Sequence, residues 1–248
     1  TDKASRSQEL HEALEDSLRD FILTWALRMS REGGGQFHHT MLVHTKETQE
    51  TMHPLVFRIK NKLESWTKAI QAGKYALDDE AEVLDNIRKR YEKEFEGKWN
   101  SPRPCPPFEK LMDSFLSEVE NRPDSWPDVI EVSSNPDYGD DIDYHQHEDG
   151  RVLVAVGGNR LSRGFTLEGL TVSYFIRHPK QLKSDTLLQQ GRWFGHRHSY
   201  SDLVRIHITD DLRKHFHSLL LIEEYLRDEL DKLERSGGKP IDYAIPVF

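Results

Sequence analysis

At 248 residues the chain is long enough to bury a hydrophobic core, as one large domain or as two small ones. Hydrophobic residues make up 36% and charged residues 31%, so the composition lies outside the range typical of disordered chains. The formal net charge of −9 argues against a protein that coats nucleic acid through a broad basic face, but it allows a local basic groove.

Three further features indicate the compartment. The single cysteine, Cys105, excludes an intramolecular disulfide and fits a reducing environment. The first residues, TDKASRSQEL, are polar and show no signal peptide. No apolar run approaches the roughly 18 residues of a membrane span. We therefore expect a soluble, cytoplasmic-type protein, or a piece of one, with no membrane association.

The N-terminal part of the chain predicts a helix followed by a strand. Over residues 7–31 large apolar side chains recur at three- and four-residue steps, which is the helical period, and the glycines 33–35 end the pattern. TMLVHT (40–45) is a short apolar run with polar flanks, as in a buried strand. Residues 50–122 are then charged and helical in period, with a Pro-rich break at 101–110.

Short β-branched runs dominate the second half of the chain. They are DVIEVSS (128–134), RVLVAVGG (151–158), LTVSYFI (170–176) and DLVRIHIT (202–209). Together with 40–45 they give about five strands with helices between them, which predicts an α/β fold with a mostly parallel sheet. We expect 1–248 to be a single domain with a helical insertion at 50–122. A C-terminal amphipathic helix, stopped near Gly237, is expected to serve as core or interface.

Two loops carry chemistry suited to phosphate. After the strand 151–158, Gly157 and Gly158 would let a ligand approach the backbone closely, and Arg160 and Arg163 supply charge. The alternative is a connecting loop whose glycines serve only its turns. The stretch LLQQGRWFGHRHSY (187–200) follows the next strand and concentrates cations and aromatics in an acidic chain. Both loops are expected at the same sheet edge, which favours one phosphate site.

The segments GGNRLSRGFTLEGLTV and LLQQGRWFGHR resemble motifs V and VI of superfamily-two helicases, in their second RecA-like domain, and TMLVHTKETQ resembles motif IV. The resemblance implies a RecA-like (P-loop NTPase-type) sheet. It also implies that Arg163, Gly164 and Gly191 contact a nucleotide and that an arginine finger reaches ATP from Arg192 or Arg197. Nucleic-acid contacts would come from five residues of the same loops, Thr45, Lys46, Asn159, Ser162 and Thr166.

Departures from the helicase pattern resemble one narrower group. Thr166 stands where an acid is usual, and Arg192 and Arg197 are five residues apart rather than three. These features are similar to the Z-one (Z1) domain, a family described as endonucleases of bacterial restriction and phage defence. No GxxxxGK[ST] phosphate loop occurs in the chain. The resemblance therefore implies the C-terminal half of an ATPase that acts on DNA. ATP and its Mg²⁺ would be held mainly by an N-terminal RecA-like half that this chain lacks.

Two alternatives remain open from the sequence. The stretch 135–150 is dense in acids and histidines and would suit a metal-dependent endonuclease. It lacks a defined ligand spacing, however, and runs of charged residues are usually solvated loops. The chain would otherwise be a non-catalytic RecA-like scaffold that binds protein partners. His38, His39 and His44 flank the first strand and are expected to be packing residues. Trp193 and Phe194 would either stack on a base or anchor the arginine loop.

Overall fold

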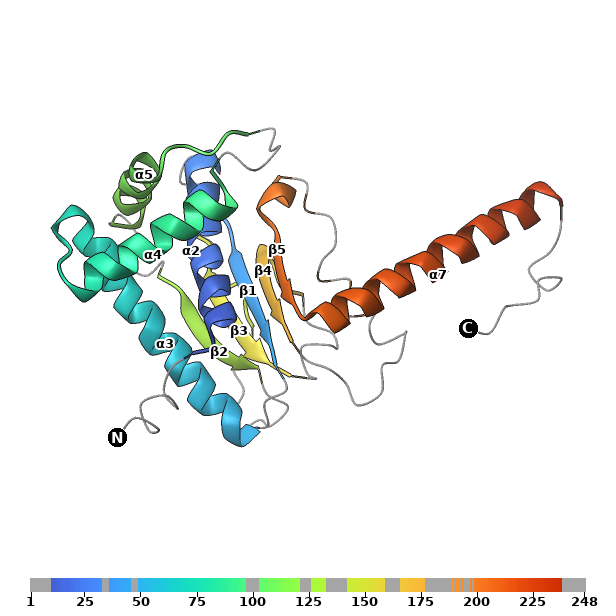
Figure 1. Cartoon of the computed structure of the whole chain (residues 1–248), viewed down its shortest axis with the longest axis horizontal. Helices are drawn as coiled ribbons and strands as arrows, with labels where there is room; N and C mark the ends of the chain where they lie inside the picture. Colours follow the sequence, from blue (N-terminus) through green and yellow to red (C-terminus); the bar gives the residue numbers. More distant parts are fainter. Residues whose placement is uncertain are drawn as a thin grey trace.

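The computed structural model describes most of the chain: residues 10–32, 36–45, 49–96, 103–120, 126–132, 142–158, 166–176 and 199–237, together with residues 189, 191, 193 and 197. Its centre is one sheet of five parallel strands in the order β2-β3-β1-β4-β5 (Figure 1). The strands are β1 (His39–His44), β2 (Asp128–Val132), β3 (Val152–Gly157), β4 (Leu170–Phe175) and β5 (Arg205–Ile208). The predicted α/β class is confirmed, and the arrangement is consistent with a RecA-like domain.

The sheet's interior explains its all-parallel pairing. Every residue of β1, β3 and β4 is buried, so these strands are covered on both faces, as is typical of parallel strands. The expected strand at 202–209 is shorter in the structure, because Ser201–Leu203 form a 3-10 turn before β5. The other strands begin and end within two residues of the prediction.

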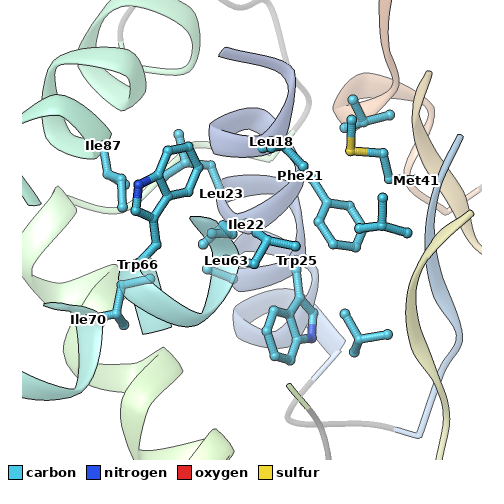
Figure 2. Close-up of a cluster of buried hydrophobic side chains, with 14 of the residues drawn as sticks. Leu18, Phe21, Ile22, Leu23, Trp25, Met41, Leu63, Trp66, Ile70 and Ile87 are labelled. Atoms are coloured by element: carbon cyan, nitrogen blue, oxygen red, sulfur yellow. The ribbon is translucent and has the colours of Figure 1, made fainter. Parts of the chain in front are cut away.

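Four helices cover one face of the sheet (Figure 1). They are α2 (Glu12–Glu32), α3 (Gln49–Ala72), α4 (Asp79–Glu94) and α5 (Phe108–Glu120). A short 3-10 turn, Gly73–Tyr75, joins α3 to the segment before α4. Figure 2 shows how α2 lies between the strands and the outer helices: Phe21 points toward Met41 of the sheet, while Leu23 lies near Trp66 and Ile87. The helical segment predicted at 50–122 therefore contributes to the larger hydrophobic core.

The opposite face of the sheet has a smaller core. Leu42, Leu153 and Ala155 pack there with Phe175, Trp193 and Leu212. Leu212 belongs to α7 (Asp210–Arg235), whose N-cap is Thr209, with the Thr209 hydroxyl accepting a hydrogen bond from Leu212 N. Beyond its first turns α7 extends away from the body (Figure 1). None of the helices that the structure describes is long and apolar enough to cross a membrane.

Two glycines fix the entry into β1. Gly169 has φ +65°, and a Cβ at this position would lie 1.8 Å from His38 O. Gly150 has φ +93°, and its Cβ would lie 2.4 Å from Phe37 O. The backbone before β1 thus passes directly beside two turns that only glycine can form. These turns, which precede β3 and β4, set the register in which both strands pair with β1.

Candidate functional site

The carboxyl ends of all five strands lie at one edge of the sheet. The pairing register places Val132, Gly157, His44, Phe175 and Ile208 in a single row across it. The loops that follow β1, β3 and β4 therefore start from adjacent strands. In open α/β sheets ligands bind in the crevice at this edge, so it is the candidate site.

His44 ends the central strand as a packing residue. Its side chain is fully buried, and its ring stacks on Phe175 with centroids 4.7 Å apart and an interplanar angle of 8°. The ring of Trp193 lies 5.6 Å from that of His44, tilted by 60°. The expectation that this histidine packs is confirmed. His44 thus joins β1 and β4 to the segment that carries Trp193 and Arg197, which we call the arginine-bearing segment.

Trp193 anchors the arginine-bearing segment. Only 5% of the residue is exposed, and its ring meets that of Phe175 edge-on at 6.2 Å. Of the two roles expected for Trp193, the structure therefore favours the anchor, because a buried indole is not available to stack on a base. The guanidinium of Arg197 donates a hydrogen bond from Nη2 to Trp193 O at 3.3 Å. Arg197, half-buried, is thereby held beside the carboxyl edge.

Of the other predicted site residues, the structure describes Gly191, Thr45 and Thr166. Gly191 has helical backbone, and a Cβ there would make only ordinary contact, 3.8 Å from Phe216 of α7. Thr45 directly follows β1 and is buried, whereas Thr166 is exposed ahead of β4. The remaining site residues fall outside the described part of the chain, as does Phe194; they are Lys46, Asn159, Ser162, Arg163, Gly164 and Arg192.

A buried carboxylate at the same edge was missed by the sequence analysis. Glu131, the penultimate residue of β2, is 6% exposed, and its Oε2 lies 3.5 Å from Nδ1 of His53 on α3. Oε2 has no hydrogen-bond donor among the residues described. The sequence signal was the acid that interrupts the apolar residues of DVIEVSS. Its position near the start of α3 suits a negative charge, because the N-terminal end of a helix carries partial positive charge.

The described part of the acidic loop lies at the opposite edge of the sheet. Residues 142–150 lead into β3 at its amino end, where Arg151 N donates to His38 Nδ1 at 3.0 Å. The Tyr144 hydroxyl meets the Thr40 hydroxyl at 2.9 Å, and burial raises the pKa of this tyrosine to about 12. Among the described residues no group of three or more metal-ligating side chains occurs. Asp137, Asp140 and Asp141 lie outside them.

Of the two other predicted histidines, His39 is also a packing residue, whereas His38 lies directly before β1 and is partly exposed. His39 is fully buried and stacks on Phe21, with ring centroids 4.7 Å apart. Burial, reinforced by the nearby charge of Arg28, lowers the pKa of His39 well below its usual range, so the ring is neutral. Burial also lowers the pKa of His38, against the opposing effect of Glu168. Neither residue faces the carboxyl edge.

Fold and site together define an α/β protein with an all-parallel sheet, at whose carboxyl edge Trp193 packs and Arg197 is held. Comparison with family models gives the assignment: the model of the Z1 domain matches residues 13–248, and the chain belongs to this family. No curated protein and no solved structure gave a significant match.

Proposed function

We propose that the chain is the second, C-terminal RecA-like domain of an ATP-dependent, helicase-like protein of the restriction and phage-defence type. The anchoring of Trp193 carries the proposal. By packing on His44 and Phe175, this residue holds the arginine-bearing segment at the edge from which the loops after β1 and β3 also start. The segment that carries Arg192 and Arg197 would thus act on an anion next to two loops whose sequences are rich in hydrogen-bond donors.

The arginines would act on a nucleotide held by another domain. Arg192 and Arg197 would stabilise the charge that develops on the γ-phosphate during hydrolysis, as arginine fingers do. Arg163, Gly164 and Gly191 would contact the same nucleotide. The chain has no phosphate loop of its own, so ATP and Mg²⁺ would be held mainly by an N-terminal RecA-like half.

The loops after β1 and β3 would contact nucleic acid. Hydroxyl, amide and ammonium groups are typical donors to a phosphate backbone, and they position a motor on DNA without reading its sequence. The chain offers such groups at Thr45, Lys46, Asn159, Ser162 and Thr166. Closure of the two halves around ATP would move these contacts relative to the partner half and couple hydrolysis to movement along DNA.

The test is the ATPase rate of the natural protein that carries this domain, with and without DNA. We expect DNA to stimulate hydrolysis, and Arg192→Ala or Arg197→Ala to lower kcat by roughly 10³-fold if that residue is the finger, the loss typical of a missing arginine finger. Arg227→Ala, which removes a mostly exposed arginine of α7, is the matched control and should leave the rate unchanged. Wild-type rates in both loop variants, with the fold retained, would refute the motor function.

A further inference from the structure

The side chain of His38 joins the residue before β1 to the residue before β3. Its Nδ1 accepts a hydrogen bond from the backbone N–H of Arg151 at 3.0 Å, and the carbonyl oxygen of Arg151 accepts one from His39 N at 2.9 Å. A backbone N–H can only donate, so Nδ1 of His38 must present a lone pair. The ring is therefore neutral in this arrangement and carries its proton on Nε2.

Protonation of His38 is incompatible with this hydrogen bond. A histidinium ring has an N–H on both nitrogens and offers no acceptor. The Nδ1–H of a charged ring would point at the N–H of Arg151, one donor against another, so the ring could gain its second proton only by turning away. A proton on His38 thus removes a contact at the point where residues 142–150 lead into β3.

The surroundings of the ring also oppose its charge. The side chain of His38 is only 21% exposed, and burial lowers its pKa. Glu168 acts in the opposite direction, because its Oε2 lies 3.7 Å from Nε2 of the ring. His147, His145 and Arg151 lower the pKa further, since their positive charges would repel a charged ring. The attached arrangement therefore favours the neutral form.

The buried contact of segment 142–150 lies against the same ring. Tyr144 packs with its ring 4.7 Å from that of His38, tilted by 57°, and its hydroxyl meets the hydroxyl of Thr40 at 2.9 Å. Residues 145–149 are exposed. Because these residues bury little apolar surface, their release from the sheet would cost far less free energy than the opening of a buried strand.

We propose that His38 is a pH-sensitive switch that holds segment 142–150 on the amino edge of the sheet while its ring is neutral and releases the segment when the ring is protonated. The released histidine would have the ordinary pKa of about 6.5, whereas the attached one has a lower pKa. Attachment is then complete above about pH 6.5 and weakens as the pH falls below that value, because the released form binds the proton more tightly. The switch uses no residue of the carboxyl edge, so it stands apart from the proposed motor function.

Amide hydrogen exchange as a function of pH tests the switch, with the rates corrected for the intrinsic effect of pH. We expect the protection of the Arg151 N–H to be constant above about pH 7 and to fall by up to about tenfold per pH unit below about pH 6.5. The N–H groups within β3 should keep their protection, which distinguishes local release from unfolding of the whole domain. Protection that falls equally in β3, or that does not change with pH at Arg151, would overturn the proposal.

Variants of His38 separate the hydrogen bond from the titration. In His38→Asn the side-chain oxygen can replace Nδ1 as the acceptor but does not titrate, so the protection of Arg151 N–H should be the same at about pH 7.5 and about pH 5.5. His38→Ala has no acceptor and should show low protection at both. His217→Asn changes an exposed histidine of α7 in the same way and should keep the wild-type pH dependence. If His38→Asn also kept that dependence, another group would be responsible and the proposal would fail.

Discussion

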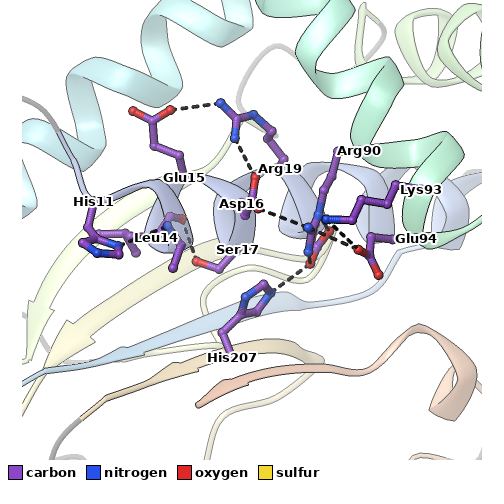
Figure 3. Close-up of polar contacts among 12 residues, drawn as sticks. His11, Leu14, Glu15, Asp16, Ser17, Arg19, Arg90, Lys93, Glu94 and His207 are labelled. Atoms are coloured by element: carbon purple, nitrogen blue, oxygen red, sulfur yellow. Dashed lines mark hydrogen bonds and ion pairs between the residues drawn. The ribbon is translucent and has the colours of Figure 1, made fainter. Parts of the chain in front are cut away.

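Asp20 is a fully buried carboxylate on α2, a helix whose inward residues are otherwise mostly apolar. Its two oxygens accept hydrogen bonds from Nε and Nη2 of Arg90 on α4, both at 2.7 Å, and one oxygen lies 2.8 Å from Nε2 of His207 on β5 (Figure 3). Burial alone would raise the pKa of Asp20, but Arg90 and His207 overcome this effect and lower it. One side chain thus joins three elements that are distant in sequence.

Removing this carboxylate should destabilise the fold severely. Asp20→Ala leaves the guanidinium of Arg90, 11% exposed, without its closest partner, and breaking a buried pair from one side typically costs about 3–5 kcal/mol. Asp16 and Glu94 remain near Arg90, which places the expected loss at the lower end, about 3 kcal/mol. Urea unfolding at pH 7 measures it, because the carboxylate is fully ionised there.

Lys89→Ala is the control for Asp20→Ala, because it breaks an exposed ion pair instead of a buried one. Lys89 is next to Arg90 on α4, and its ion pair with Asp85 lies on the exposed face of the helix. Lys89→Ala should therefore leave the unfolding midpoint unchanged. Equal effects of Asp20→Ala and Lys89→Ala would mean that the buried network contributes nothing to stability.

Local pattern determines individual elements but not their contacts. The strands were predictable because apolar, β-branched runs between polar loops have few alternatives, and α2 was predictable from its helical period. The partners of Asp20 were not, because periodicity says nothing about which charges meet across 70 or 187 positions. For the same reason the two roles considered for Trp193 could be separated only by the structure: its contacts, His44 and Phe175, come from two other strands.

The turn before β4 gives a prediction at the level of a single element. Gly169→Ala would force a Cβ to within 1.8 Å of a backbone oxygen in addition to the strain of its positive φ. Since the backbone before β1 cannot move without disturbing its pairing with β3 and β4, we expect a loss of about 3 kcal/mol or more. Thermal unfolding followed by circular dichroism measures this loss.

A substitution at Gly237 separates the strain of a positive φ from the steric clash of an added Cβ. Gly237 has φ +73°, but a Cβ there would meet no atom within 4 Å. Gly237→Ala therefore carries only the backbone strain, about 1–2 kcal/mol, and that strain falls at the end of α7, where it can relax by fraying. If both variants melt at the same temperature, the close approach at the start of β1 does not limit stability.

The whole molecule is asymmetric about its sheet. The face covered by α2 to α5 carries the larger core, with Trp25, Trp66 and Phe115 fully or almost fully buried. The other face has the smaller core, to which α7 contributes only its first turns. Most of the buried apolar residues thus lie on one face of the sheet, whereas Phe175 and Trp193, which anchor the arginine-bearing segment, belong to the smaller core on the other face.

Two deletions should reveal this asymmetry. Replacing residues 79–120 by a short Gly-Ser linker removes α4 and α5 and exposes the outer side of α2, including Trp25, which packs edge-on against Phe115 at 4.7 Å. An apolar face of that size cannot remain stable in water, so this variant should lack a cooperative thermal transition. Truncation after Ile222 removes, of the residues that the structure describes, only the part of α7 that extends beyond the body, and the variant should melt as a folded protein close to the wild type. A folded 79–120 deletion would instead mean that α4 and α5 form a separable insertion, and that α2 with the sheet is sufficient for a stable core.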